Sequence, residues 1–84
     1  MQISVDISLY PLQEEFIPPI SSFIERLAQY KELELVRNAM STQVFGPYQR
    51  VLEIIAAEMQ KTHQQTPKAS FVIKALAGDV RQRV

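Results

Sequence analysis

The chain has no cysteine, and only two of its 84 residues are glycine. Without cysteine there is no disulfide framework, no thiolate metal site and no thiol nucleophile. Two glycines do not supply the glycine-rich loop that cradles a phosphate. Nine basic residues balance nine acidic ones, so the chain has no net charge to attract nucleic acid or an anionic membrane.

Long apolar stretches are also missing. No run approaches the roughly 20 residues that a helix needs to span a bilayer. The N-terminus lacks the basic-then-apolar pattern of a signal peptide. We therefore expect a cytoplasmic protein with no membrane partner.

The length fits one domain, residues 1–84. Hydrophobic residues make up 46% of the chain and charged residues 21%, a balance that argues against disorder. A chain this small buries only about 60–65% of the surface that its unfolded form exposes, so its stability margin is thin. Small domains commonly gain stability by forming oligomers.

Hydrophobic spacing predicts six elements in the order β-α-β-β-α-β. Alternation of apolar and polar residues indicates strands, while proline pairs and Gly-Pro steps mark where helices begin. The expected elements are a strand at residues 2–10, a helix from Pro18 to Ala28, a hairpin at residues 32–46 that turns near residues 38–40, a helix that starts at Gly46-Pro47 and a strand at residues 70–78. In the first helix, Ser22 and Arg26 are expected to face solvent. Arg81 and Arg83 are expected in a solvated basic tail.

The usual compact arrangement of these elements is an α+β, ferredoxin-like fold. Its four-stranded antiparallel sheet has the order 4-1-3-2, and both helices cover one face. The first and third strands are then central neighbours. Ile3, Val5, Ile7 and Leu9 face the helices, which leaves the other face of the sheet open.

The open face is expected to be too apolar for water and too polar for a dry core. Such a surface suggests a partner, a ligand, or both. Packing of the sheet against a neighbouring subunit and a small-molecule site are both compatible with the pattern. The residues expected there are Asp6, Ser8, Tyr10, Gln43, Phe45 and either Val72 or Leu76.

Two short motifs carry a resemblance to a known family. They are "ISLYPL" at the end of the first strand and "MSTQVFG" at the third strand. Together, at this spacing, they resemble the thiamine-binding YkoF-like family. The resemblance implies a ferredoxin-like domain that binds thiamine or its hydroxymethylpyrimidine portion without chemical change. It also implies paired units, here a homodimer or homotetramer because the chain holds a single repeat.

This resemblance suggests roles for six residues. Ser8, Thr42 and Gln43 would hydrogen-bond the aminopyrimidine edge. We expect Ser8 and Thr42 to face one ligand across adjacent strands, with Ile7 on the other face. The remaining roles are ring stacking by Tyr10 or Phe45 and balancing of the thiazolium charge by Asp6.

Other functions fit the sequence less well. His63 is the only histidine and is expected near the end of the second helix, where a cation interacts favourably with the helix dipole. With no second histidine and no cysteine, we expect no transition-metal site and no cofactor. The sequence shows no nucleophile–base pair of the kind that an enzyme uses. An RNA-recognition module would need exposed aromatic residues among basic ones, and this sequence has no net positive charge. The alternative to ligand binding is a ligand-free structural or protein-interaction domain that assembles through its sheet.

Overall fold

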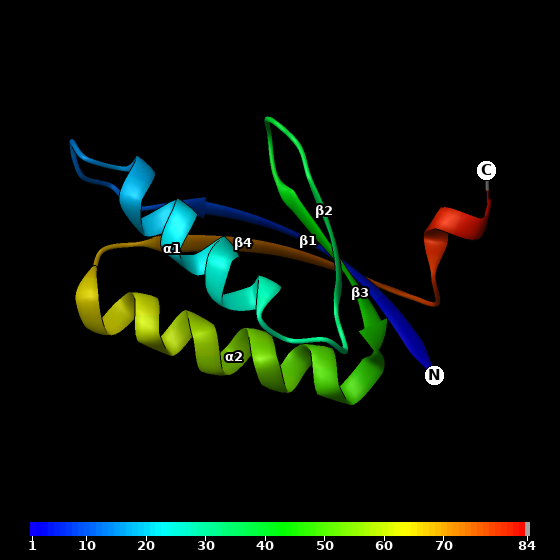
Figure 1. The fold of residues 1–84 in the computed structure, drawn as a ribbon. Coiled ribbons are helices and arrows are strands. Elements are labelled where there is room, and N and C mark those ends of the chain that lie inside the picture. The colour runs from blue at the N-terminus through cyan, green and yellow to red at the C-terminus, as the bar shows by residue number, and fades with distance from the viewer. Residues whose placement is uncertain (84) are drawn as a thin grey trace.

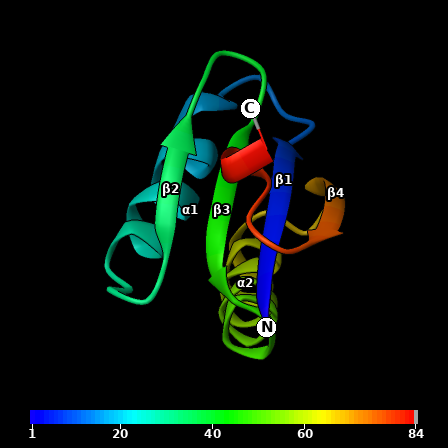
Figure 2. The ribbon, with the colours of Figure 1, turned by 90° about the vertical axis from the view of Figure 1, so that its right-hand side faces the viewer.

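A computed structural model shows one antiparallel sheet of strand order β2-β3-β1-β4, with both helices on one face (Figures 1 and 2). It describes residues 1–83, with the backbone alone for residues 82 and 83. The expected ferredoxin-like topology is therefore confirmed. The elements are β1 (Gln2–Tyr10), α1 (Ile17–Ala28), β2 (Glu34–Arg37), β3 (Thr42–Pro47), α2 (Tyr48–Gln65), β4 (Ser70–Ala77) and the short 3-10 helix η1 (Val80–Arg83).

The hydrophobic core lies between the sheet and the two helices. β1 contributes every second residue, which follows from the alternation of side chains along a strand. Helix residues three and four positions apart supply the opposing layer. The most deeply buried members are Ile3, Val5, Phe23, Leu27, Val44, Val51 and Ile54.

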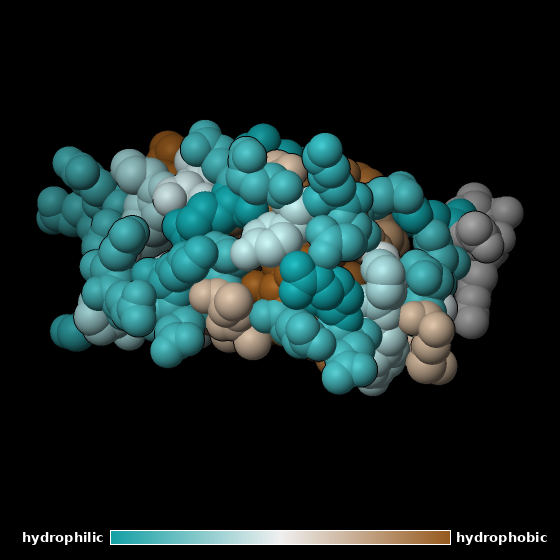
Figure 3. All heavy atoms as spheres, turned by 60° about the horizontal axis from the view of Figure 1, so that its bottom comes forward, coloured by the Kyte–Doolittle hydropathy of each residue, from teal (hydrophilic) through white to brown (hydrophobic). Residues whose placement is uncertain are grey.

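The outer surface of the helical layer is polar. Figure 3 brings the α2 side of the molecule forward and shows it mostly hydrophilic, with apolar atoms in the gaps between polar side chains. Neither helix within residues 1–83 is long and apolar enough to cross a bilayer.

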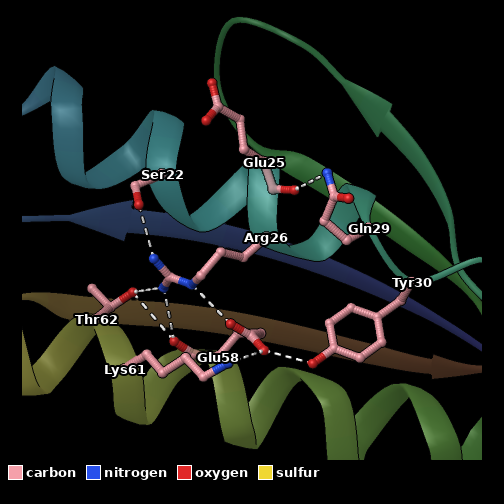
Figure 4. A network of polar contacts seen from close by, with 8 residues as sticks. All are labelled: Ser22, Glu25, Arg26, Gln29, Tyr30, Glu58, Lys61 and Thr62. Atoms are coloured by element: carbon pink, nitrogen blue, oxygen red, sulfur yellow. Dashed lines mark hydrogen bonds and ion pairs between the residues drawn. The ribbon is translucent and has the colours of Figure 1, made fainter.

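A buried ion pair joins the two helices (Figure 4). Glu58 of α2 is 1% exposed, and its Oε1 accepts a hydrogen bond from Arg26 Nε at 2.8 Å. Tyr30 Oη donates to Glu58 Oε2 at 2.7 Å. Arg26 also donates to Ser22 Oγ at 2.9 Å and to Thr62 Oγ1 at 2.8 Å. The guanidinium thus connects both helices.

The expectation that Ser22 and Arg26 face solvent is therefore wrong. These two residues lie one turn apart on the flank of α1 that meets α2. The periodicity of a single helix identifies its apolar stripe, but it does not say which polar flank a second helix will cover.

The environment of Glu58 favours its charged form. Burial raises the pKa of this carboxyl, but the hydrogen bonds from Tyr30, Arg26 and Lys61 outweigh burial and lower the pKa below its ordinary value. A carboxyl with a lowered pKa stabilises the fold when the pH is above its unfolded pKa, about 4.3. That contribution is lost as the pH falls through the folded pKa.

We predict that Glu58→Gln lowers the free energy of unfolding at pH 7 by about 1.5–3 kcal/mol, because hydrogen bonds to a charged group are lost. Urea unfolding at several pH values measures this. The difference from wild type should shrink as the pH falls below about 4. Glu53→Gln on the exposed side of α2 is the matched control and should cost less than about 0.5 kcal/mol. A pH-independent loss in Glu58→Gln would contradict the assignment.

The C-terminal segment folds back over the open face of the sheet. Gly78 reverses the chain with φ of 84°, and η1 lies in front of β1 and β3 in Figure 2. Ser4 Oγ donates to Gly78 O at 2.7 Å and accepts a hydrogen bond from Val80 N at 3.0 Å. These bonds fix the segment to β1.

Arg81 is exposed, as expected of a solvated tail residue, but its guanidinium is held in contacts rather than free. Its guanidinium lies 4.1 Å from the centre of the Phe45 ring and pairs with Glu34 and Asp79, each at 2.6 Å. Phe45 is only 4% exposed as a result. The side chain of Arg83 lies outside the described residues.

Candidate functional site

A pocket of about 460 Å³ lies where β1 ends, between α1 and the turn that joins β2 to β3. Its volume falls in the range of small-molecule sites. We call it the β1-end pocket. It is lined by Ile7, Ser8, Leu9, Tyr10, Pro11, Leu12, Gln13, Phe16, Ile20, Phe23, Ile24, Asn38, Ala39, Met40, Ser41 and Thr42.

The interior of the pocket is apolar, and so is much of its rim. Ile7 from β1 and Phe23 and Ile24 from α1 are buried core residues that also line the pocket. Tyr10 and Phe16 at the rim are each 52% exposed. No acidic or basic side chain is among the lining residues. The pocket therefore offers ring-sized apolar contact with a few neutral polar groups.

The polar groups come from the end of β1 and from the β2–β3 turn. Asn38 Oδ1 accepts hydrogen bonds from the backbone N–H of Met40 at 3.1 Å and of Ser41 at 3.0 Å. This Asx-type arrangement orders the turn. The Ser8 hydroxyl makes only a long contact of 3.4 Å to Met40 O, so it is available for a stronger bond.

The Thr42 hydroxyl is also available. Thr42 is 6% exposed, and within residues 1–83 its hydroxyl has no partner from the chain. No side-chain nitrogen or oxygen of the described residues is both fully buried and unpaired. The Thr42 oxygen therefore keeps some accessible surface, and its residue lines the pocket.

The strand register corrects the expected position of Thr42. Thr42 pairs directly with Ile7 in the β1–β3 ladder, and directly paired residues point to the same face of a sheet. Thr42 thus lies on the helix side with Ile7, and Ser8 points to the other side. Both still line the β1-end pocket, because the pocket lies at the end of the sheet. Residue patterns within each strand did not fix the register between them.

The backbone is strained at this pocket. Leu12 has φ of 57°, a left-handed conformation that costs a non-glycine residue about 1–2 kcal/mol. It lies in the loop that carries the chain from β1 into α1 and lines the pocket. Strain of this kind is often found at ligand sites.

The other three predicted residues lie elsewhere. Asp6, Gln43 and Phe45 line a second hollow of about 270 Å³ on the open face. Ser41 Oγ donates to Asp6 Oδ1 at 2.6 Å. Arg81 covers the Phe45 ring. The six predicted residues thus divide between two hollows, with Ser8, Tyr10 and Thr42 in the larger one.

Sequence reasoning missed the contribution of α1 and the loop before it. Gln13, Phe16 and Ile20 line the β1-end pocket. A signal was present, since this loop directly follows "SLYPL" and enters a helix at a proline pair. The alternation within the first strand points to the open face of the sheet and says nothing of the loop that closes the end of that strand.

His63 has a structural role. It lies in the last turn of α2, as expected. Its Nε2 is 2.9 Å from Ala69 O, and its ring is nearly perpendicular to the Phe71 ring, with the two ring centres 5.2 Å apart. No group of three or more histidine, aspartate or glutamate residues within residues 1–83 could hold a metal ion.

Comparison with known proteins gives a fold likeness. No protein-family model matches the sequence, and no curated protein matches it. A proposed thiamine biosynthesis/salvage protein from Thermotoga maritima matches with a TM-score of 0.88 at 13% identity, over 100% of this chain and 96% of that one. A protein from Streptococcus pneumoniae matches with a TM-score of 0.87 at 18% identity, over 96% of this chain and 91% of that one.

A third solved structure is a domain of unknown function (DUF77) from Bacillus cereus. Its TM-score is 0.75 at 17% identity, over 93% of this chain and 77% of that chain. The chain thus shares its complete fold with these proteins. The likeness shows the fold that the resemblance of the two motifs implied.

Proposed function

We propose that the chain binds thiamine, or its hydroxymethylpyrimidine portion, in the β1-end pocket without chemical turnover and as a homo-oligomer. The observation that carries this proposal is the pocket of about 460 Å³ at which both motifs meet, with Ser8, Tyr10 and Thr42 in its lining. The fold likeness to the Thermotoga maritima protein supports it.

The chemistry of the pocket suits a flat heteroaromatic ring. Ile7, Phe23 and Ile24 provide apolar contact for the ring faces. The Thr42 and Ser8 hydroxyls each donate or accept one directional hydrogen bond at the ring edge. At the mouth, the half-exposed ring of Tyr10 would stack on the thiazolium, and an aromatic face near a cation contributes about 0.5–2 kcal/mol.

The absence of charged side chains from the pocket lining restricts which form of the ligand the pocket can bind. A phosphate ester would leave its negative charge without a cationic partner there, which is costly in a partly desolvated site. Free thiamine and hydroxymethylpyrimidine fit better than their phosphates. The lining also has no carboxylate, imidazole or amine to act as a general base, which supports binding without turnover.

A ligand-free interaction domain is the second candidate. The observation that favours it is the exposure of apolar side chains on β4, where Val72 is 58% exposed and Leu76 51%. Such residues are suited to contact with another protein surface.

Calorimetric titration separates the two candidates. We expect saturable heat and a rise in melting temperature with thiamine and with hydroxymethylpyrimidine, and weaker binding of thiamine phosphates. An uncharged sugar alcohol serves as the control ligand. Absence of both heat and thermal shift with every pyrimidine would favour the interaction domain.

Thr42→Val tests the pocket itself. Valine keeps the β-branched shape and removes the hydroxyl, so a ligand group loses its partner at a cost of about 1–3 kcal/mol. This corresponds to about 10- to 100-fold in the dissociation constant. The fold should be unaffected, since valine packs well beside Ile7. Unchanged affinity would show that the ligand does not contact this hydroxyl.

Ile7→Ala is the companion variant, on the same face and directly opposite Thr42. Ile7 is a buried core residue. Its truncation leaves a cavity and should cost about 2–5 kcal/mol of unfolding free energy. Denaturant unfolding of both variants thus separates loss of a ligand contact from loss of core packing.

The oligomeric part of the proposal has its own test. The chain has a mass of 9.6 kDa, and its small core favours stabilisation by association. Light scattering at micromolar concentration should give a mass at least twice that of the chain. A monomer at every concentration would overturn this part and leave ligand binding untouched.

A further inference from the structure

A polar hollow of about 300 Å³ lies where α1 begins and α2 ends, at the left of Figure 1. We call it the helix-end hollow. Hydroxyl, carboxamide and guanidinium groups gather there, in contrast to the apolar β1-end pocket, and Gln13 is the one residue that lines both. The lining residues are Gln13, Glu15, Pro18, Pro19, Ser22, Arg26, Thr62, Gln65 and Thr66.

The guanidinium of Arg26 keeps one N–H unused at this hollow. Its Nε and one N–H of Nη1 donate to Glu58 Oε1 and Ser22 Oγ, and both N–H groups of Nη2 donate, to Glu58 O and Thr62 Oγ1 (Figure 4). A guanidinium has five N–H donors, so the second N–H of Nη1 has no acceptor within residues 1–83. The Arg26 side chain is 23% exposed, so this remaining donor is accessible from outside the fold.

Two hydroxyl groups add further donors. Ser22 Oγ accepts the hydrogen bond from Arg26, and its own hydrogen makes no bond to the part of the chain that the structure describes. Thr66 is only 9% exposed, and its hydroxyl likewise has no partner among the described side chains and backbone. It keeps some accessible surface, and its residue lines the hollow. A hydroxyl this deeply buried is usually hydrogen-bonded, so its partner is expected to come from outside the chain.

The charges around the hollow favour an anion. Arg26 and Lys61 both pair with Glu58, so two cations share one carboxylate and one positive charge is in surplus. The positive end of the α1 dipole and the negative end of the α2 dipole offset each other here. Glu15 opposes an anion, but it is exposed, and salt and water screen its charge. The surplus at Arg26 therefore decides the sign.

We propose that the helix-end hollow binds a small oxyanion, either a carboxylate or a phosphate group, through Arg26, Ser22 and Thr66. Ionised oxygens act as hydrogen-bond acceptors, which is what three unused donors from two helices require. Hydrogen bonds between such donors and an anion are shorter and stronger than those between neutral groups. This site lies outside the pocket proposed for thiamine, and the inference does not rest on that function.

Titration of the wild-type chain followed by backbone amide chemical shifts tests the proposal. We expect saturable shifts at Ser22, Gln65 and Thr66 with sodium phosphate or sodium acetate, at fixed pH and with chloride adjusted to hold the ionic strength. A response to acetate alone identifies a carboxylate site, and a response to phosphate identifies a phosphate site. Sodium chloride is the control and should give no saturable shift. The absence of a saturable shift with both oxyanions would overturn the proposal.

Thr66→Val removes one of the three donors without breaking an internal hydrogen bond. The backbone N–H of Thr66 donates to Thr62 O at 2.7 Å and its carbonyl accepts from Ala69 N at 3.0 Å, and valine keeps both. The oxyanion dissociation constant should rise about 10-fold, with little change in melting temperature.

Thr42→Val is the matched control, since it removes a buried, unpartnered hydroxyl from the other pocket. It should leave oxyanion binding unchanged. Unchanged oxyanion affinity in Thr66→Val, or an equal loss in Thr42→Val, would contradict the assignment. Failure of thiamine binding in the wild-type chain would overturn the proposed function and leave the oxyanion site standing.

Glu15→Gln tests the sign of the ligand charge. The change removes a negative charge from the lining and keeps the shape of the side chain, so phosphate or acetate should bind about two- to fivefold more tightly at low salt. Glu14→Gln removes an equally exposed charge from a residue that does not line the hollow, and its effect should be smaller. Equal or weaker binding in Glu15→Gln would show that the occupant of the hollow is not an anion.

Discussion

The position of β1 between β3 and β4 is the constraint on which the rest of the structure depends. Its odd-numbered residues face the helices and form the floor of the core, while its backbone bonds alternately to the strands on either side. The pocket lies where this strand stops. The segment after β4 is likewise fixed by Ser4 of β1. A single residue of register shift in β1 would move every one of these contacts to the wrong face.

The fold was predictable because local signals agreed with one another. Alternation in residues 2–10, the proline pair and the Gly-Pro step at the two helix starts, and the apolar stripes of both helices all favoured the same topology. What these signals do not contain is the relation between elements that are distant in sequence. The Arg26–Glu58 pair, which joins residues 32 positions apart, and the stacking of Arg81 on Phe45 both depend on that relation. In the first contact an apparently solvent-facing charge is partly buried between the helices, and in the second an exposed one is paired and lies on an aromatic ring.

The candidate site was half predictable for the same reason. The motifs correctly brought the end of β1 and the start of β3 together, and Ser8, Tyr10 and Thr42 line one pocket. The side of the sheet on which Thr42 lies was not predictable, because the β1–β3 register is set by the β2–β3 turn and by core packing. Asp6, Gln43 and Phe45 share a sheet face with Ser8, yet the distance along the strands and the covering Arg81 assign them to a different hollow.

The proposed pocket is linked to β4 through the β1–β4 ladder. Ser8 pairs with Val72 and Tyr10 with Ser70, so the strand end that carries the pocket is held in place by the first half of β4. As an unpaired edge strand, β4 is held on one side only. The order of Ser8 and Tyr10 at the pocket therefore depends on pairing with a strand that β1 alone holds in place. A preorganised site spends less of its binding free energy on ordering, so the strength of the β1–β4 ladder contributes to binding at the proposed pocket.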